Sequence, residues 1–403
     1  MKRTIFSITA VLCLAASAHA EKLTIWTGLD GKELEWLTQT AKDFSKTKEG
    51  AGVTVDVVVV PYNEIDNKLK QSAPTGTGPD LLGLLPHDRV GALATAGVLE
   101  PVAQYLDAKT KFDLPASALD AMSYNGKLFG FPAFGEAVAI VYNKKLLPGG
   151  IPKTWNSFIS TSQKLTNPQA QQFGFLTNIT LPYTVYGFYS SMGAYVFGKK
   201  ADGSFNPADI GLGNAGAVKG AQLLADMRFK QGLIPAGAEA TDVQKDLFTK
   251  GKLAMWLTGP WDIGDVKKAG IDYGVGVPPK PTGAKGKFSP FVGIQGILMN
   301  AYGKNKPKAA QLAKYLTNAQ NQTDMNTIGG RIPVSKSAVR KLKNDPVVAG
   351  FGAAIAAGTP MPNIPEMGSV WNPWNNAISL SVKTANADIQ GLLGKAVGQM
   401  VTK

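Results

Sequence analysis

The pattern of hydrophobic positions alternates between strand and helix signals over the first part of the chain. A short apolar strand is expected at residues 23–26, and apolar residues then recur at helical spacing from 34 to 44. The run VTVDVVVV at 53–60 is almost continuously β-branched, which predicts a strand buried on both faces. A short helix at 64–71 and the strand DLLGLL at 80–85 complete a β-α-β-α-β order, which is typical of a parallel sheet covered by helices.

The loops after these strands are the first place to look for a binding site. Ligands of such sheets bind at the carboxyl ends of the strands. The loops that follow the first three expected strands lie at residues 27–32, 61–64 and 86–90.

The first twenty residues, MKRTIFSITAVLCLAASAHA, form a separate hydrophobic segment. Lys2 and Arg3 precede a short apolar stretch, and Ala18-His19-Ala20 has the form of an A-x-A cleavage site. The apolar stretch is too short to span a bilayer stably. We expect a secretory signal removed after Ala20 and a periplasmic protein. Cys13 lies in a poor lipobox context, which favours a free soluble protein over a lipoprotein.

The rest of the chain continues the mixture of strands and helices. Strands are expected at residues 137–142, 253–257 and 291–299, and helices dominate from Lys306 onward. Strand-rich and helix-rich segments do not separate into two halves, and about 383 residues after the signal exceed one ordinary hydrophobic core. The sequence therefore predicts two lobes, each assembled from discontinuous segments, with several crossings between them.

The composition excludes several classes of site. After removal of the signal no cysteine remains, and His87 is the remaining histidine, so thiolate chemistry, a histidine triad and a multi-histidine metal site are not expected. No D-x-D-x-D-G loop is present, and neither a metal nor a cofactor is expected. The formal net charge of +13 becomes +11 without Lys2 and Arg3. The lysines are dispersed, which indicates solubility or docking to an acidic partner, with anion binding as an alternative and no nucleic acid as partner.

No catalytic motif accompanies this composition. The chain contains no G-x-x-x-x-G-K-[ST] and no H-E-x-x-H, and Gly76-Thr77-Gly78 precedes a strand, which indicates a turn and not a dinucleotide site. Asp88 and Glu136 are candidates for a carboxylate pair of the kind that hydrolyses glycosides, but no sequence feature fixes their separation. The chain is expected not to be an enzyme, and a secreted glycosidase is the alternative from that class.

The residues expected at strand ends combine charged groups with large aromatic rings. The hydroxyl groups of an uncharged polyhydroxylated ligand both donate and accept hydrogen bonds, so carboxylate and guanidinium groups can bind them in pairs. The apolar C–H faces of such a ligand lie flat on aromatic rings. The mixture therefore indicates a sugar-binding site. The candidate residues are Asp30, Lys32, Glu64, Asp88, Arg89, Glu136, Tyr183, Trp261 and Trp371.

The stretch MPNIPEM at 361–367 is rich in proline and is followed by Trp371. Proline fixes one backbone angle and removes a backbone donor, so this segment is a stiff loop and not a helix interior. Stiffness lowers the entropy that Trp371 would lose on meeting a flat ligand face. Trp374, three positions later, is expected to pack in the core.

Several of these stretches together resemble the maltose/maltodextrin-binding proteins of the extracellular solute-binding family 1, which have the type II periplasmic-binding-protein fold. The resemblance covers essentially the whole chain after residue 20. TGTGPD at 75–80 and EAVAIVYNKKLLP at 136–148 are shared widely by sugar-binding relatives, whereas MPNIPEM followed by a tryptophan is more particular to maltodextrin binders. Other matching stretches are LTIW at 23–26, HDR at 87–89, NGKL at 125–128, KTW at 153–155, NAGA at 214–217, GPW at 259–261 and PFVG at 290–293.

The resemblance implies two α/β lobes, each a mostly parallel sheet flanked by helices, joined by a multi-segment hinge with the sugar between them. It implies a non-enzymatic, monomeric receptor that binds a maltose- or maltodextrin-like α-glucan and docks on the permease subunits of an ABC importer. After the signal at 1–20, the implied segments are 21–133 and 294–332 for the N-lobe, and 134–293 and a helical 333–403 for the C-lobe.

The contact residues of the family fall on the candidates above, with two departures. Leu84-Leu85-Pro86, with one extra residue, stands where the family has a tryptophan before HDR, and Leu181 replaces a glutamate before Pro-Tyr. These departures leave open a different chain length, a cyclic glucan, or another α-glucoside such as trehalose or sucrose, and they make Leu85 a candidate contact with a sugar face. The implied contacts are Asp30, the lysine of the first loop (Gly31 or Lys32, of which Lys32 is chosen), Asp88, Arg89, Glu136, Tyr183, Trp261 and Trp371.

Overall fold

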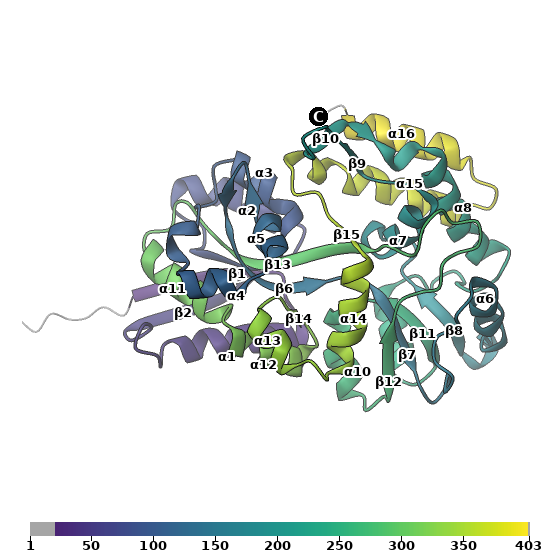
Figure 1. The fold of residues 1–403 in the computed structure, drawn as a ribbon, viewed down its shortest axis with the longest axis horizontal. Helices are drawn as coiled ribbons and strands as arrows, with labels where there is room; N and C mark the ends of the chain where they lie inside the picture. The colour runs from purple at the N-terminus through teal and green to yellow at the C-terminus, as the bar shows by residue number, and fades with distance from the viewer. Residues whose placement is uncertain (1–20, 402–403) are drawn as a thin grey trace, which may run out of the picture.

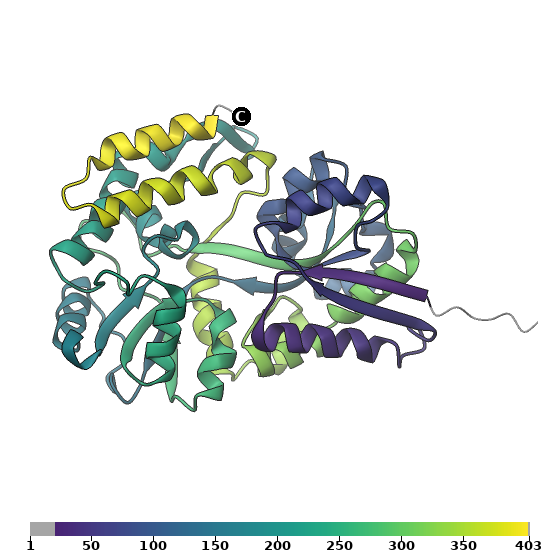
Figure 2. The ribbon, with the colours of Figure 1, turned by 180° about the vertical axis from the view of Figure 1, so that it is seen from behind.

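The computed structural model describes residues 21–401 as a two-lobed α/β protein (Figure 1). The expected signal segment 1–20 lies outside the described residues, as do residues 402–403. The first lobe contains the N-terminal strands and helices, and the second contains the middle of the chain and the last two helices, as both ribbon views show (Figures 1 and 2). The expected two-lobed α/β fold is therefore confirmed, although the sheets are mixed and not mostly parallel.

The sheet of the first lobe has the order β14-β6-β13-β3-β1-β2, with β15 paired to β13. The strand β1 is parallel to β2 and to β3, as the β-α-β-α-β pattern predicts, whereas β13 runs antiparallel to β3 and to β6. The strands are β1 Glu21–Thr27, β2 Val53–Val59, β3 Leu81–Pro86, β6 Gly130–Glu136, β13 Phe291–Met299, β14 Ile332–Pro333 and β15 Thr359–Pro360. A two-stranded sheet adds β4 Ser123–Tyr124 and β5 Lys127–Leu128.

The strand β2 is not buried on both faces, which corrects the expectation for 53–60. Val58 is 40% exposed and Val59 is 55% exposed. Because β3 pairs with β1 on its other side, β2 is left at the edge of the sheet. The β-branched run thus predicts the strand correctly. The position of the strand in the sheet depends on pairings that the local sequence does not encode.

Helices cover both faces of this first sheet. The helix α1 buries Trp36, Leu37 and Phe44, which recur at the helical spacing seen in the sequence. The helices of the first lobe are α1 Gly31–Phe44, α2 Ile65–Ser72, α3 Val90–Thr95, α4 Ala108–Asp113, α5 Ala116–Ala121, α11 Lys306–Leu316, α12 Ala319–Gly329 and α13 Lys336–Lys341.

The extra residue that the family resemblance implies before HDR coincides with a bulge in β3. The pairing of β13 with β3 shifts between Gly296 opposite Leu85 and Leu298 opposite Leu82, so β3 has one residue more than its partner over this interval. Leu84 lies inside the interval with a positive φ of 53°, a conformation that L side chains rarely adopt. The bulge therefore lies within the strand, before Pro86.

The second lobe is built on the four-stranded sheet β12-β7-β11-β8. Its helices begin where the sequence places capping residues: Thr154 forms a capping box with Ser157, and the Asn214 side chain accepts a hydrogen bond from Ala217 N. The strands are β7 Ala139–Asn143, β8 Phe173–Thr177, β11 Leu253–Thr258 and β12 Tyr273–Gly276, with a separate pair, β9 Phe197–Lys199 and β10 Phe205–Ile210. The helices are α6 Trp155–Lys164, α7 Pro182–Met192, α8 Ala215–Phe229, α9 Thr241–Thr249, α10 Ile263–Lys268, α14 Pro346–Ala357, α15 Trp371–Lys383 and α16 Ile389–Val401.

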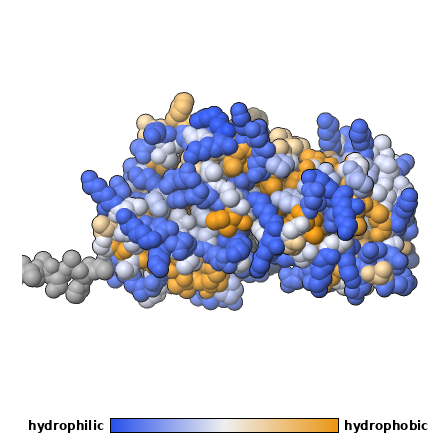
Figure 3. Space-filling model, turned by 90° about the horizontal axis from the view of Figure 1, so that it is seen from below, coloured by the Kyte–Doolittle hydropathy of each residue, from blue (hydrophilic) through white to orange (hydrophobic). Residues whose placement is uncertain are grey.

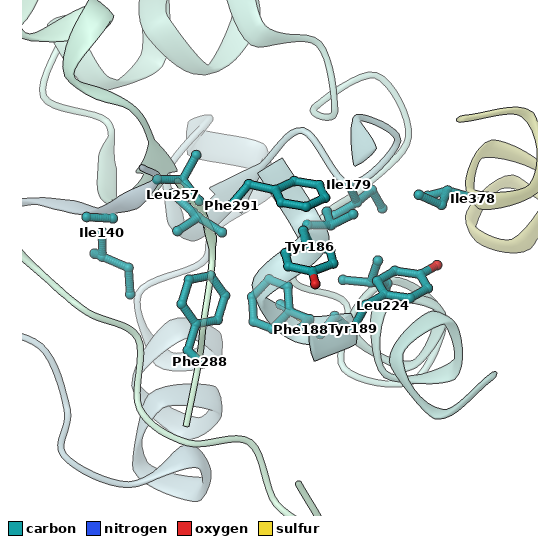
Figure 4. Packing of buried hydrophobic residues seen from close by; sticks show 14 of the residues in the cluster. Ile140, Ile179, Tyr186, Phe188, Tyr189, Leu224, Leu257, Phe288, Phe291 and Ile378 are labelled. Atoms are coloured by element: carbon teal, nitrogen blue, oxygen red, sulfur yellow. The ribbon is translucent and has the colours of Figure 1, made fainter. Parts of the chain in front are cut away.

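Aromatic rings fill the core of the second lobe beside α7 (Figure 4). The rings of Tyr186 and Phe291 stack with centroids 3.6 Å apart, and Trp374 presents its edge to Tyr186 and Tyr189. Trp374 is fully buried, which confirms its expected packing role. This cluster anchors both α7 and the end of β13, the elements that carry Tyr183 and lead to the site.

The chain crosses between the lobes along β6, along β13 and through residues 358–370 (Figure 1). Phe134 belongs to the core of the first lobe and Ala137 to that of the second, and the same change occurs between Ile294 and Phe291. The expected boundary at 133/134 therefore falls inside β6, and the one at 293/294 falls inside β13. The expected boundary at 333 falls in β14, and α13 still packs on α12 and β14. The segment that packs in the second lobe begins with α14.

Polar side chains cover most of the surface seen from below, with small apolar patches between them (Figure 3). No helix within residues 21–401 is long and apolar enough to cross a bilayer.

The packing of α7 gives a test of the second core. Gly187→Ala would place a methyl group inside the Phe288 ring position, so we expect a loss of about 1–3 kcal/mol in unfolding free energy. Gly352→Ala is the matched control, because it also lies in a helix and its new methyl group would meet no atom within 4 Å. Denaturant unfolding should show a slight gain for Gly352→Ala; equal losses in both variants would contradict this packing.

Candidate functional site

Asp88 and Trp371 meet between the lobes. Trp371 begins α15 after the proline-rich crossing, and its Nε1 donates a hydrogen bond to Asp88 Oδ2 over 3.0 Å. Asp88 follows β3 in a short 3-10 turn and is 7% exposed. Its second oxygen, Oδ1, is buried without a hydrogen-bond partner. The pair thus joins two residues 283 positions apart and leaves one acceptor unfilled.

Arg89 does not pair with Asp88. Its Nη1 donates to Asp66 Oδ1 over 2.8 Å and to the carbonyl of Tyr62 over 3.1 Å, and the guanidinium lies 4.0 Å from the centroid of the Tyr62 ring. Arg89 therefore fixes the loop after β2, and Tyr62, which is partly exposed, joins the site. Sequence reasoning missed Tyr62, although it lies in the loop 61–64 that the strand pattern had already selected.

Glu136 belongs to a buried network of charges. Arg331 Nη1 donates to Glu136 Oε2, while its Nε and Nη2 donate to the two oxygens of Glu33. Gln295 Nε2 donates to Glu136 Oε1 over 2.8 Å. The network links α1, β6, β13 and the residue before β14. Burial opposes the charge on Arg331, but Glu33 and Glu136 more than compensate and raise the pKa of its guanidinium.

The network residues Glu33, Gln295 and Arg331 were also missed from sequence. Glu33 lies in the first turn of α1, where an acidic residue is the usual helix-dipole choice, so its role is not distinctive there. Arg331 follows Gly329 and Gly330 at the end of α12, and nothing local connects it to a residue 298 positions away.

Aromatic rings of the second lobe surround this network. The ring of Tyr183 lies 5.9 Å from that of Trp261 and 6.0 Å from that of Phe291, and Arg331 lies 5.8 Å from the Trp261 ring. Trp261 follows β11 in a 3-10 turn that begins at Pro260. Tyr183, Trp261 and Trp371 are all partly buried, in contrast to the fully buried Trp374. Burial, followed by the nearby charge of Glu136, raises the pKa of the Tyr183 hydroxyl well above its usual value.

Four of the expected contacts are not part of this cluster. Asp30 is exposed at the start of α1 and makes no capping hydrogen bond, and Lys32 pairs with Glu35. Glu64 is exposed at the start of α2 and pairs with Lys68. Leu85 is fully buried in the core of the first lobe. Asp30 and Lys32 remain predicted contacts at the edge of the lobe interface, where Lys32 Cβ approaches the position of Gly264 on α10.

His87 and Asn363 tie the third crossing to the first lobe. His87 Nδ1 accepts a hydrogen bond from Ile294 N over 3.0 Å, so its Nε2–H donates to the carbonyl of Met361 over 2.9 Å. Asn363 Nδ2 donates to the carbonyls of Ala121 and Ser123. His87 is thus a satisfied structural group, and the loop that carries Trp371 is held at both of these points.

The described residues 21–401 offer no metal site, because no three histidine, cysteine, aspartate or glutamate side chains gather there in a suitable way. Two shallow hollows elsewhere on the second lobe, of about 460 and 430 Å³, are lined by α9 and α10 and by α15 and α16. They do not contain the residues of the site between the lobes, which has the polar and aromatic groups suited to a ligand.

Asp88 and His87 make opposite contributions to the pH dependence of stability. Burial raises the pKa of Asp88 to about 6, against the charge of Arg89 and the Trp371 hydrogen bond, so the folded protein holds a proton that the unfolded chain releases above its ordinary pKa of 3.8. Burial lowers the pKa of His87 to about 4, so the unfolded chain holds a proton there up to its ordinary 6.5. As pH rises from about 4 to 6, the contribution of Asp88 to the unfolding free energy therefore decreases, whereas the contribution of His87 increases.

Asp88→Asn should expose the His87 contribution. Without the opposing carboxyl, the unfolding free energy should fall more steeply on acidification from pH 6 to 4 than in the wild type, by up to about 1.4 kcal/mol per pH unit. His87→Gln should change the slope in the opposite direction. Denaturant unfolding at several pH values measures both slopes, and parallel curves for all three proteins would refute the assignment.

Comparison with known proteins agrees with the two-lobed geometry. Residues 39–350 match the family model of bacterial extracellular solute-binding proteins. The chain is 33% identical, over 94% of its length and 89% of the relative, to a galactooligosaccharide-binding protein of Bacillus subtilis (strain 168). It is 30% identical, over 94% of its length and 82% of the relative, to a maltotriose-binding protein of Pyrococcus abyssi (strain GE5 / Orsay).

Solved structures give the same answer. The Thermus thermophilus maltotriose binding protein bound with maltotriose superimposes with a TM-score of 0.89 at 45% identity, covering 94% of this chain and 98% of that one. A cyclo/maltodextrin-binding protein complexed with maltotetraose gives 0.77 at 34% identity, covering 94% and 96%. With most of its length matched in sequence and in fold, the chain belongs to the family of bacterial extracellular solute-binding proteins.

Proposed function

We propose that this protein is the extracytoplasmic receptor of an ABC sugar importer and that it binds a maltodextrin-type α-glucan between its lobes. The observation that carries the proposal is the Asp88–Trp371 pair: a buried carboxylate with one unfilled acceptor lies at the edge of a partly exposed indole. A sugar hydroxyl would donate to the carboxylate while the C–H face of the sugar ring lies on an aromatic surface.

The internal pairing of the charges supports a neutral ligand. Arg331 is already bonded to two carboxylates, and Arg89 is bonded to Asp66. Neither guanidinium is left as an unpaired cation for an anionic ligand, whereas Asp88 Oδ1 still needs a donor. Hydroxyl groups provide such donors without adding charge to the site.

The relatives support the sugar class and suggest two candidates within it. A maltotriose-binding relative and a maltotriose-bound structure favour maltooligosaccharides. A galactooligosaccharide-binding relative at 33% identity makes galactooligosaccharides the second candidate. Leu181, half-exposed next to Pro182 and Tyr183 where the resemblance implies an acid, is a departure that bears on this choice.

The proposed transport role uses the lobe arrangement. A ligand that contacts both lobes stabilises the form in which they lie closest, because only that form makes all the contacts. The closed, loaded monomer then docks on the permease subunits in the membrane. The protein performs no catalysis in this role, and after export its signal is removed behind Ala20, which leaves a free periplasmic protein.

Isothermal titration of sugar-free mature protein tests the proposal. The panel is maltose, maltotriose, maltoheptaose, a cyclodextrin, trehalose, sucrose and a galactooligosaccharide. We expect saturable binding that favours the maltooligosaccharides and changes little with salt, since the ligand is uncharged. Tighter binding of the galactooligosaccharide would make it the ligand in place of a maltodextrin. If no sugar of the panel binds, the protein is not a receptor for this class of sugars. Release of products from maltoheptaose would establish a glycosidase instead.

Trp371→Ala tests the site at one residue. Loss of a central aromatic contact typically costs at least about 2 kcal/mol of binding, so we expect at least about a 30-fold higher Kd for maltotriose. Tyr302→Ala is the control, because this partly exposed ring follows the far end of β13, opposite the site. Unchanged affinity of Trp371→Ala would show that the sugar binds elsewhere.

A further inference from the structure

Gln295 is a buried residue of the site that neither the sequence pattern nor the family resemblance indicates. It lies on β13 opposite Pro86 of β3 and opposite Phe134 of β6, and it is 6% exposed. Its Nε2 donates to Glu136 Oε1 over 2.8 Å. Its Oε1 is buried and has no hydrogen-bond partner.

The orientation of the Gln295 amide follows from the charges around it. Both carboxylate oxygens of Glu136 act as acceptors, since Arg331 Nη1 donates to Oε2 and Gln295 Nε2 donates to Oε1. The amide nitrogen must therefore face Glu136, and the amide oxygen must face away from it. Arg331 in turn is fixed by both oxygens of Glu33 on α1.

Several buried side-chain oxygens within residues 21–401 have no hydrogen-bond partner, including those of Gln231, Gln311 and Asn326, whereas other buried glutamines bond at both ends. Gln244, which is also fully buried, donates through Nε2 to Ala238 O and accepts through Oε1 from Trp256 Nε1. Gln322 likewise bonds at both ends, to Thr317 O and to the amides of Val334 and Ser335. Because a buried polar group without a partner is destabilising, native structures keep few of them, and those few call for an explanation.

A second acceptor without a partner lies close by at Asp88, whose Oδ1 is also buried. Pro86, the β3 partner of Gln295, lies two residues before Asp88, so both acceptors stand at the same end of adjacent strands. Tyr183 of the second lobe lies within electrostatic range of both Glu136 and Asp88. Two unfilled acceptors at one site match a ligand that carries two hydroxyl donors.

We infer that Gln295 is a ligand-contacting residue whose side-chain oxygen accepts a hydrogen bond from a sugar hydroxyl, and that Arg331 is a positioning residue that orients it through Glu136. This inference rests on the proposed function and adds to it. The site then accepts hydrogen bonds from at least two sugar hydroxyl groups, one at Asp88 and one at Gln295. A sugar that lacks the hydroxyl facing Gln295 leaves the acceptor unpaired in the complex and therefore binds more weakly.

The test compares wild type with Gln295→Met, which keeps the side-chain length and removes the acceptor. Titrations use maltotriose and a set of maltotrioses that each lack one hydroxyl. For maltotriose we expect about a tenfold higher Kd in Gln295→Met. For one deoxy sugar, wild type should show a higher Kd than for maltotriose. For the same deoxy sugar, Gln295→Met should show about the same Kd as for maltotriose. Gln244→Met is the matched control and should lower the melting temperature without changing any Kd.

The outcomes separate this inference from the proposed function. If wild type binds no maltooligosaccharide, the proposed function fails. If wild type binds maltotriose and Gln295→Met binds it equally well, or if every deoxy sugar is discriminated equally by both proteins, Gln295 is not a contact.

The positioning role of Arg331 has its own readout. Arg331→Lys keeps the charge but cannot bond three carboxylate oxygens at once in the fixed geometry of a guanidinium. With the amide no longer oriented, Gln295→Met should raise Kd much less in the Arg331→Lys background than in wild type. Additive effects of the two changes on Kd, measured in a double-mutant cycle, would overturn the role.

Discussion

The buried guanidinium of Arg331 is the constraint on which the site depends. A charge inside a protein must be paired, and removing one partner of such a pair costs about 3–5 kcal/mol. Arg331 meets this requirement with Glu33 from α1 and Glu136 from β6, so three segments distant in sequence have to converge before the network is satisfied. The convergence point lies where β6 and β13 cross between the lobes, and this is also where the aromatic rings of the second lobe approach.

The same pairing determines what kind of ligand the site suits. Since the carboxylates of Glu33 and Glu136 are taken up by Arg331 and that of Asp66 by Arg89, the groups left with unfilled capacity are neutral or acceptor-only: Asp88 Oδ1 and Gln295 Oε1. A hydroxyl-rich ligand fills such positions, whereas a carboxylate or phosphate would meet oxygen atoms. The chemistry suited to a sugar therefore follows from which charges are already satisfied and not from the presence of charged residues alone.

Local sequence predicted the elements but not their long-range partners. The strand at 291–299, the helix with apolar spacing from 34 to 44 and the buried Trp374 could be predicted because periodicity and apolar character act over a few residues. The edge position of β2 and the bonding of Arg89 to Asp66 could not, because both depend on sheet order and on contacts across the lobe. Arg331 is the extreme case, since its partners are 298 and 195 positions away.

The bulge in β3 coincides with the extra residue that the family resemblance implies before HDR. Leu84 adopts a positive φ in this bulge, and both Leu84 and Leu85 are buried in the core, so neither adds an apolar side chain to the site. An aromatic ring is still present in this part of the first lobe, because Arg89 holds Tyr62 beside it.

Trp371 is placed by both lobes. The loop before it is tied to the first lobe through His87 and Asn363, while α15, which it begins, packs through Trp374 into the second core. Contacts with both lobes therefore hold Trp371 in its position relative to Asp88. The prolines of the loop also remove backbone freedom that ligand binding would otherwise have to restrict. The aromatic surface offered to a ligand is therefore largely ordered before the ligand arrives, which is the condition under which a flat stacking contact contributes most to affinity.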